Sequence, residues 1–276
     1  MQIIDFILNI AAWILWVNGW MQFHNPTDIQ RPLTLLGTLV GPSRRLGSAW
    51  IYFSGFLLIL LIKTLLLHYL GAPIDTTMSV NFMLLMVYFK TGTLVSMFWM
   101  ALASFLKFAM IAYIWVWFMS RISRKDIAEN IVNGLGASLG FLQNRHWIIQ
   151  VLALVFFGMI GWISLAMIFG WLGMLPAITD RSHLIWQAFC ISIYAWLALY
   201  YLIIILMVLY LIQSYVHLGN WEGWDWLEGV SERLLSPLTV VPLQWARIDF
   251  APIVVLLLNW LCYLAADRMI LAIYQW

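Results

Sequence analysis

Long apolar runs without strict alternation recur six times along the chain. Each reaches or exceeds the roughly 20 residues that a helix needs to cross the hydrocarbon core of a bilayer. Unpaired backbone groups are so costly in hydrocarbon that such runs form helices or barrel strands, and their length and irregular pattern exclude a barrel. The sequence therefore predicts an all-α integral membrane protein. The six expected spans are Ile3–Phe23, Trp50–Leu70, Leu94–Phe118, Trp147–Trp171, Leu184–Tyr215 and Ile253–Tyr274.

Composition agrees with this class. Of the 276 residues, 64% are hydrophobic and only 9% are charged, whereas a soluble domain carries roughly a quarter charged residues. The first run lacks a basic leading segment and a small-residue cleavage site, so we expect it to remain as a helix. The formal net charge of +2 argues against a nucleic-acid partner. Cysteine and histidine spacing predicts no metal site and no cofactor.

Positive charge is distributed unevenly between the segments that join the spans. The long segments carry nine lysines and arginines, and the short segments carry three. The nine are Arg31, Arg44, Arg45, Arg121, Arg124, Lys125, Arg145, Arg233 and Arg247, and the three are Lys90, Arg181 and Arg268. By the positive-inside rule, the long segments are cytoplasmic and both termini lie on the opposite side. A bacterial inner membrane is the expected location.

The order of span, long amphipathic segment and span occurs three times. The predicted units are residues 1–75, residues 76–178, which begin with an interfacial segment at Thr77–Phe89, and residues 182–276. The first two units close with glycine and proline just after a span, as in Leu172-Gly173-Met174-Leu175-Pro176, a pattern that stops helices.

Apolar residues in each long segment have helical spacing, which predicts helices that lie along the membrane surface with their apolar face down. Asn25 before Pro26, and Ser123 in capping-box spacing with Asp126, are the expected helix caps. Ordinary connecting loops with incidental periodicity are the alternative. The stripes are Ile29, Leu33, Leu36 and Val40; Ile127, Ile131, Leu135 and Leu139; and Trp224, Leu227, Val230 and Leu234.

Two stretches carry a family resemblance. The first unit has Phe23-His24-Asn25-Pro26 followed by Gly41-Pro42-Ser43-Arg44-Arg45, and the third has Arg233-Leu234-Leu235-Ser236-Pro237 followed by Ile248-Asp249-Phe250-Ala251-Pro252. These stretches resemble the repeat motif of the YggT family of small bacterial and plastid membrane proteins. The third unit departs from the motif, with Thr239-Val240 in place of the arginine pair and Ala246-Arg247 in place of the glycine pair.

The resemblance implies a fold of span–amphipathic–span repeats and a role class. Members of the family are associated with membrane-complex biogenesis, including haem attachment to a cytochrome, and with osmotic tolerance. A haem-protein complex is therefore one partner that the resemblance implies. The resemblance implies no reaction.

Several residues at the predicted interfaces are candidate binding or capping groups. Arg44 and Arg45 stand where guanidinium groups bind lipid phosphate or an acidic partner well, although they could act only as topology-setting charges. Asp249 is placed to cap the last span. Three tryptophans fit an interfacial anchor or, alternatively, an aromatic patch for a protein partner. They are Trp221, Trp224 and Trp226.

Three charged residues fall inside the spans, where a charge costs on the order of 3 kcal/mol. Lys107 lies near the middle of the third span and should face protein or a water-filled cavity. Lys63 and Asp267 lie toward the outer ends of the second and sixth spans, where a pair between them would offset the burial of each. Fixation of helices to one another is the favoured interpretation, and an ion pathway is the alternative.

The sequence shows no nucleophile–base set, so we do not expect an enzyme. The favoured hypothesis is a non-enzymatic scaffold, assembly factor or accessory subunit that binds phospholipid and other integral membrane proteins. The alternative is a small transporter or channel-like protein involved in ion or osmotic adaptation.

The topology is testable by labelling single cysteines in a cysteine-free background. Cysteines at Ser43, Ser123 and Ser231 should be labelled from one side of the membrane, and cysteines at Thr76 and Ser182 from the other. A mixed pattern within either set would overturn the predicted arrangement.

Overall fold

The computed structural model describes most of the chain. The described residues are 2–24, 49–71, 77–82, 85–90, 93–123, 139, 145–175, 181–216, 221–238, 244–245 and 248–274. Six helical runs among them are long and apolar enough to cross a membrane, which confirms the predicted fold class and all six predicted spans. These runs are α1 (Gln2–His24), α3 (Ala49–Gly71), α4 (Leu94–Ile122), α6 (Trp147–Trp171), α7–η2–α8 (Arg181–Tyr215) and α10 (Ala251–Tyr274).

The contacts divide the chain into two compact units. Unit 1 comprises Met1–Met110 and Gly140–Ile191, and unit 2 comprises Ile111–Leu139 and Ser192–Trp276. Helix α4 and the α7–η2–α8 run each contribute one part to either unit. The three units predicted from the sequence are consecutive along the chain, whereas these two units are defined by contacts. The division into three units stays a prediction.

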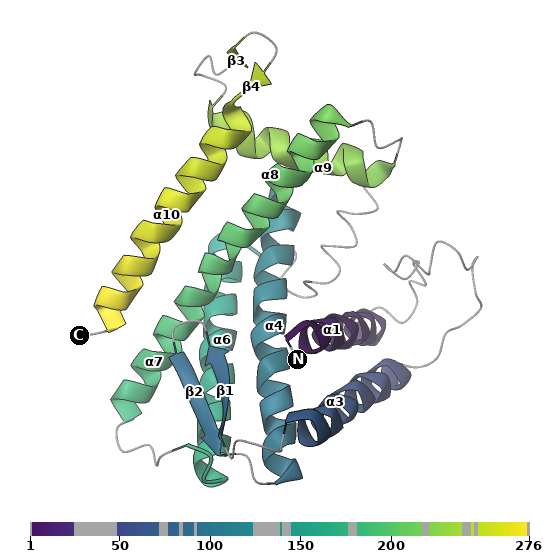
Figure 1. The fold of residues 1–276 in the computed structure, drawn as a ribbon, viewed down its shortest axis with the longest axis vertical. Coiled ribbons are helices and arrows are strands. Elements are labelled where there is room, and N and C mark those ends of the chain that lie inside the picture. The colour runs from purple at the N-terminus through teal and green to yellow at the C-terminus, as the bar shows by residue number, and fades with distance from the viewer. Residues whose placement is uncertain are drawn as a thin grey trace. The chain divides into compact units, whose positions relative to one another are not determined.

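In unit 1, α1 and α3 lie side by side (Figure 1). The two helices approach closely at Gly19, where a Cβ atom would lie 3.1 Å from the ring of Phe53. Small residues allow such close packing between helices in a membrane, where no hydrophobic effect drives helix association. Ala12, Leu60 and Phe105 join α1, α3 and α4 in one buried cluster.

Helix α4 begins where two hydroxyl side chains replace missing helical hydrogen bonds. The Ser96 amide donates to Thr93 Oγ1 at 3.2 Å, and the Thr93 amide donates to Ser96 Oγ at 3.3 Å. This reciprocal arrangement is that of a capping box. The 29 residues of α4 give it a length of roughly 43 Å, more than the roughly 30 Å hydrocarbon core requires.

Helix α6 ends at the glycine that the sequence predicts. Gly173 has a φ of 67°, a conformation that residues with a Cβ atom rarely adopt. Its amide donates to Gly170 O at 3.1 Å, and the Met174 amide donates to Phe169 O at 2.9 Å. These two bonds define a Schellman motif, and Met174 and Phe169 are both buried in the same apolar cluster.

The predicted interfacial segment Thr77–Phe89 contains an antiparallel hairpin. Strands β1 (Thr77–Phe82) and β2 (Leu85–Lys90) pair in a register that places Thr77 opposite Lys90. A hairpin satisfies backbone groups of a segment that is too short to cross the membrane as a helix. A second short ribbon, β3 (Gln244–Trp245) with β4 (Ile248–Asp249), precedes α10.

In unit 2, α8 (Leu199–Tyr215) packs against α10, and α9 (Glu222–Leu235) lies across one end of both (Figure 1). Helix α9 is the amphipathic helix predicted for the third long segment. Its apolar stripe, however, is covered by protein, since Leu227 and Val230 are buried against Leu206 and Met207 of α8. The expectation that this stripe lies face down on lipid is therefore wrong. Packing against α8 and α10 already removes the apolar face from water.

The other two predicted surface helices fall almost wholly outside the described residues, and so do Asn25, Arg44 and Arg45. Within α9, Ser231 is fully buried, and Ser123 at the end of α4 is also buried. Neither is a suitable labelling position for the topology test. The exposed Glu228 of α9 is the better position for the third long segment.

Replacing Gly173 with alanine should lower the free energy of unfolding by about 1–2 kcal/mol, because a Cβ atom disfavours the left-handed conformation. The measurement is unfolding of the purified protein in mixed detergent micelles.

Gly170→Ala is the matched control. Gly170 lies one turn earlier within α6 and has open space around a Cβ atom, so alanine there should be neutral or stabilising by up to about 1 kcal/mol. Equal effects of the two substitutions would contradict the assigned helix end.

Candidate functional site

Lys63 of α3 is a buried charged residue within a described span. Its side chain is only 3% exposed. The ammonium group lies 2.7 Å from Asp5 Oδ1, donates to Asn9 Oδ1 at 2.8 Å and donates to the Ala101 carbonyl at 3.4 Å. Three acceptors match the three donors of an ammonium group. Lys63 therefore holds its charge inside the protein without an unused donor.

Two of the three acceptors of Lys63, Asp5 and Asn9, form a closed hydrogen-bonded ring with Ser104. Asn9 Nδ2 donates to Asp5 Oδ2 at 3.2 Å and to Ser104 Oγ at 3.3 Å. Ser104 Oγ donates to Asp5 Oδ2 at 3.0 Å. Asp5 and Asn9 belong to α1, Lys63 to α3 and Ser104 to α4, so Lys63 and this polar ring tie together three helices of unit 1.

Lys107 lies one turn beyond Ser104 on α4. It is half-buried and interacts electrostatically with Asp5. Residues three apart on a helix lie on the same face, which places Lys107 on the side of α4 that carries Ser104. Asp5 thus interacts with two lysines, as the carboxylate of a small intramembrane charge cluster.

The geometry of the cluster suits fixation of helices better than proton transfer through Lys63. Each hydrogen of the Lys63 ammonium group has an acceptor in the surrounding helices, so release of a proton would leave one of these acceptors without its donor. The low dielectric of a span strengthens the attraction between Lys63 and Asp5, and the ring also satisfies the carboxylate. The side chain of Asp5 is nevertheless 39% exposed, so the cluster is open on the α1 side.

Asp267 does not pair with Lys63, contrary to the sequence prediction. Its Oδ1 atom accepts a hydrogen bond from the Tyr194 hydroxyl at 2.8 Å, within unit 2. The sequence could not choose between Asp5 and Asp267 as the partner of Lys63, because both lie near the ends of apolar runs.

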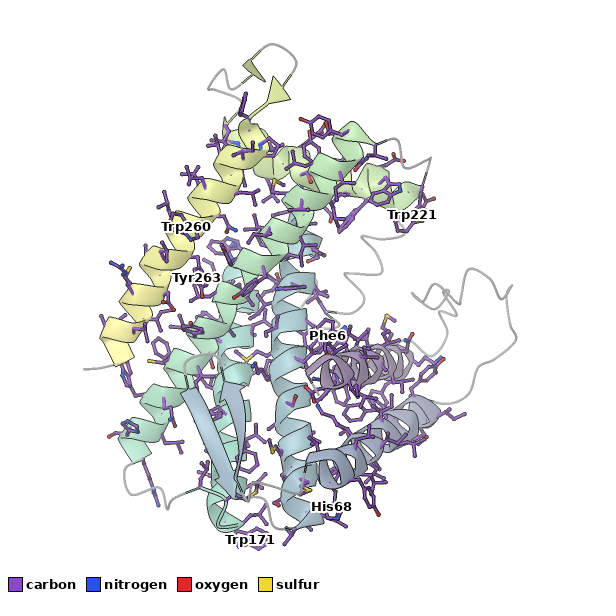
Figure 2. All side chains as sticks on the ribbon, viewed as in Figure 1. Phe6, His68, Trp171, Trp221, Trp260 and Tyr263 are labelled. Atoms are coloured by element: carbon purple, nitrogen blue, oxygen red, sulfur yellow. The ribbon has the colours of Figure 1, made fainter. Side chains whose placement is uncertain are left out.

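Tyr194 belongs to a group of neighbouring tyrosines in unit 2. Tyr263 of α10 hydrogen-bonds with Tyr194 and with Tyr201. Its ring also stacks on Tyr200 of α8, with ring centroids 4.5 Å apart. Figure 2 shows Tyr263 between α10 and α8. Asp267 therefore belongs to a polar and aromatic seam between α10 and the α7–η2–α8 run.

A third group of polar contacts fixes α9 to the end of α4. Trp226 Nε1 donates to Ser123 Oγ at 2.8 Å, and Ser123 Oγ donates to the Met119 carbonyl at 2.6 Å. Arg233 Nη1 donates to the Ile122 carbonyl at 2.8 Å. A cation at a helix C-terminus compensates its unpaired carbonyls and its dipole.

These contacts revise the interpretation of the three tryptophans. Trp226 connects α9 with α4, and Trp224 is half-buried, with its carbonyl accepting from Gln213 Nε2 at 3.3 Å. Trp221 alone among the three is strongly exposed, at 59%, and Figure 2 shows it at one end of α9. It remains the candidate for lipid or partner contact.

The two remaining capping assignments are not decided by the described residues. Ser123 is bonded to α4 and Trp226, while its predicted partner Asp126 lies outside the described residues. Asp249 lies in β4, two residues before α10, and its side chain is not among those described.

Sequence reasoning missed Asp5, Asn9 and Ser104. The first two are four residues apart inside an apolar run, a spacing that places them on one helix face. That spacing was a usable signal for an intramembrane polar site. The participation of Ser104 carried no such signal, because a lone serine in a span is common.

No family model, curated protein or solved structure matches the chain. The resemblance to the YggT family therefore stays a prediction.

The polar ring predicts a specific pattern of stabilities. Lys63→Met should lower the free energy of unfolding in detergent micelles by about 2 kcal/mol, because the Asp5 carboxylate loses its counter-charge. The effect should fall below the roughly 3–5 kcal/mol typical of fully buried pairs, since Asp5 is 39% exposed.

The double variant Lys63→Met/Asp5→Asn should recover part of this loss, because neither partner of the ion pair is left charged. The recovery should be incomplete, since Lys107 loses its attraction to Asp5. Arg181→Met, at an exposed arginine, should change stability by less than about 0.5 kcal/mol. Strictly additive effects at Lys63 and Asp5 would show that the pair contributes nothing.

Proposed function

We propose that the protein is a non-enzymatic scaffold, assembly factor or accessory subunit of a larger membrane protein complex. The observation that carries this proposal is the state of α9. Its apolar face is buried, two side chains bond it to α4, and its charged face is turned outward. A helix held in this way presents a fixed polar surface beside the spans, which is what a docking subunit needs.

The outward face of α9 is acidic. Glu222, Asp225 and Glu228 are all exposed and follow one another at intervals of three residues, so they form one ridge along the helix. Under the proposed topology this ridge faces the cytoplasm of a bacterial cell. A partner with a basic surface would be attracted to it and kept in register by charge complementarity.

The intramembrane charges support the same proposal. Lys63 and Asp5 are engaged with each other and with two further side chains across three helices. Charges that are paired inside the spans stabilise the fold. Interaction with other proteins would then involve residues at the surface. The resemblance to the YggT family, whose members are associated with membrane-complex biogenesis, points to the same role and to a haem-protein complex as a possible partner.

A small transporter or channel-like protein is the second candidate. One observation favours it, namely that the charge cluster of Asp5, Lys63 and Lys107 is open at Asp5. Ionisable residues inside a membrane commonly mark ion pathways. Ion flux in liposomes that contain the purified protein alone would favour this candidate over a scaffold.

The scaffold proposal is tested by purification of the tagged protein in mild detergent followed by mass spectrometry. We expect stoichiometric membrane-protein partners. The variant Glu222→Lys/Asp225→Lys/Glu228→Lys should reduce their recovery at least about tenfold at low salt, because rim charges chiefly control association. Its added lysines agree with the proposed topology and should not invert it.

The matched variant Glu222→Gln/Asp225→Asn/Glu228→Gln should give an intermediate loss. Recovery in both variants should be compared at equal amounts of folded protein. A particle that is always purified alone, or partners that are retained fully by the lysine variant, would argue against α9 as the docking surface.

A further inference from the structure

The hairpin of β1 and β2 has two chemically different faces. Residues directly opposite each other in an antiparallel pair share a face, and successive residues of a strand alternate between faces. The register therefore places only apolar residues on one face, and residues with a hydroxyl, amide or amine group at five of six positions on the other. The apolar face has Met78, Val80, Phe82, Leu85, Val87 and Phe89, and the polar face has Thr77, Ser79, Asn81, Met86, Tyr88 and Lys90.

Two membrane spans hold the hairpin close to one boundary of the membrane. Lys90 lies four residues before Leu94, the first residue of α4, and Thr77 lies six residues after Gly71, the last residue of α3. An extended chain covers at most about 3.6 Å per residue, so the base of the hairpin lies within roughly 14 Å of α4 and roughly 21 Å of α3. Helices α3 and α4 are successive spans, so α3 ends on the side of the membrane where α4 begins.

Exposed aromatic residues mark the headgroup level on this side. Tyr69 in the last turn of α3 and Trp171 at the end of α6 are both strongly exposed. Helix α6 is the next of the six spans after α4, so it ends where α4 begins. Figure 2 shows Trp171 and His68, the neighbour of Tyr69, at the same end of unit 1. Tryptophan and tyrosine favour the membrane–water interface.

The edges of the hairpin favour the membrane surface over the hydrocarbon core. Among the described residues the hairpin is a sheet of two strands, so each strand has one outer edge with unpaired amides and carbonyls. Lipid tails offer these groups no partner, whereas water and headgroups do. A hairpin that lies on the membrane surface meets this requirement and still removes its apolar face from water.

We propose that the β1–β2 hairpin is a lipid-binding element, which rests its apolar face on the acyl chains of one leaflet and turns its polar face toward water. Lipid is the occupant that the two short connections to α3 and α4 favour, because they hold the hairpin at the membrane boundary whether or not another protein is present. The proposal requires only that α3 and α4 span the membrane, and it does not rest on the proposed scaffold function.

The test uses the full-length protein in phosphatidylcholine vesicles, with single cysteines that carry a nitroxide spin label in a cysteine-free background. Electron paramagnetic resonance measures how readily each label is reached by oxygen, which concentrates in lipid, and by a water-soluble nickel chelate. Labels at Val80 and Phe82 should be reached well by oxygen and poorly by the chelate. Labels at Ser79 and Asn81 should show the reverse, so the two accessibilities should alternate along β1 in opposite phase.

Two positions calibrate the measurement. A label at Leu58, which is exposed within α3, gives the value for lipid. A label at Glu228, which is exposed on α9, gives the value for water.

Phe89→Asn and Tyr88→Asn form a matched pair, because they introduce the same residue at adjacent positions on opposite faces of β2. Phe89→Asn should lower the oxygen accessibility of a label at Val80 at least about twofold, since binding to the interface scales with buried apolar area. Tyr88→Asn should leave it unchanged.

Four results would overturn the proposal. The first is a lack of alternation along β1. The second is low accessibility of the apolar face to both reagents, which would show that protein covers it. The third is spin–spin broadening between labels at Val80, which would identify a second copy of the chain as the occupant. The fourth is an equal effect of Phe89→Asn and Tyr88→Asn.

Discussion

A charge or polar backbone group inside a membrane has to find its partner within the protein, because hydrocarbon offers none. Lys63 illustrates this constraint, since its ammonium group is almost wholly buried in a span. The ring of Asp5, Asn9 and Ser104 meets it from two other helices. One buried lysine thus determines which faces of α1, α3 and α4 must pack together.

The same constraint operates on backbone groups at the helix ends. Thr93 and Ser96 satisfy the first amides of α4, and the Schellman motif at Gly173 satisfies the last carbonyls of α6. Arg233 does the same for the end of α4, although it belongs to α9. Arg233 thus satisfies a helix end and, together with Trp226 and the apolar packing against α8, fixes α9 in unit 2.

How far the sequence predicts this structure depends on the range of the interaction. The six spans and the end of α6 follow from local apolar runs and from one glycine. The partner of Lys63 did not follow, because its 54-residue separation from Asn9 is bridged only in the packed helices. Helix α9 was predicted from its periodicity, but whether lipid or protein covers its stripe depends on α8, which periodicity within α9 cannot show.

The two intramembrane aspartates have different kinds of partner in the two units. In unit 1 the charge of Asp5 is compensated by lysine, and the resulting ring rigidly joins three helices, so any change of its charge state would loosen the fold. In unit 2 the carboxylate of Asp267 accepts a hydrogen bond from the neutral hydroxyl of Tyr194, whose loss leaves no buried ammonium behind. Loss of a neutral donor leaves only one charge without its partner, whereas loss of one residue of an ion pair leaves an uncompensated charge in the span. The seam of α10 therefore joins its helices without an ion pair, whereas the packing of unit 1 depends on one.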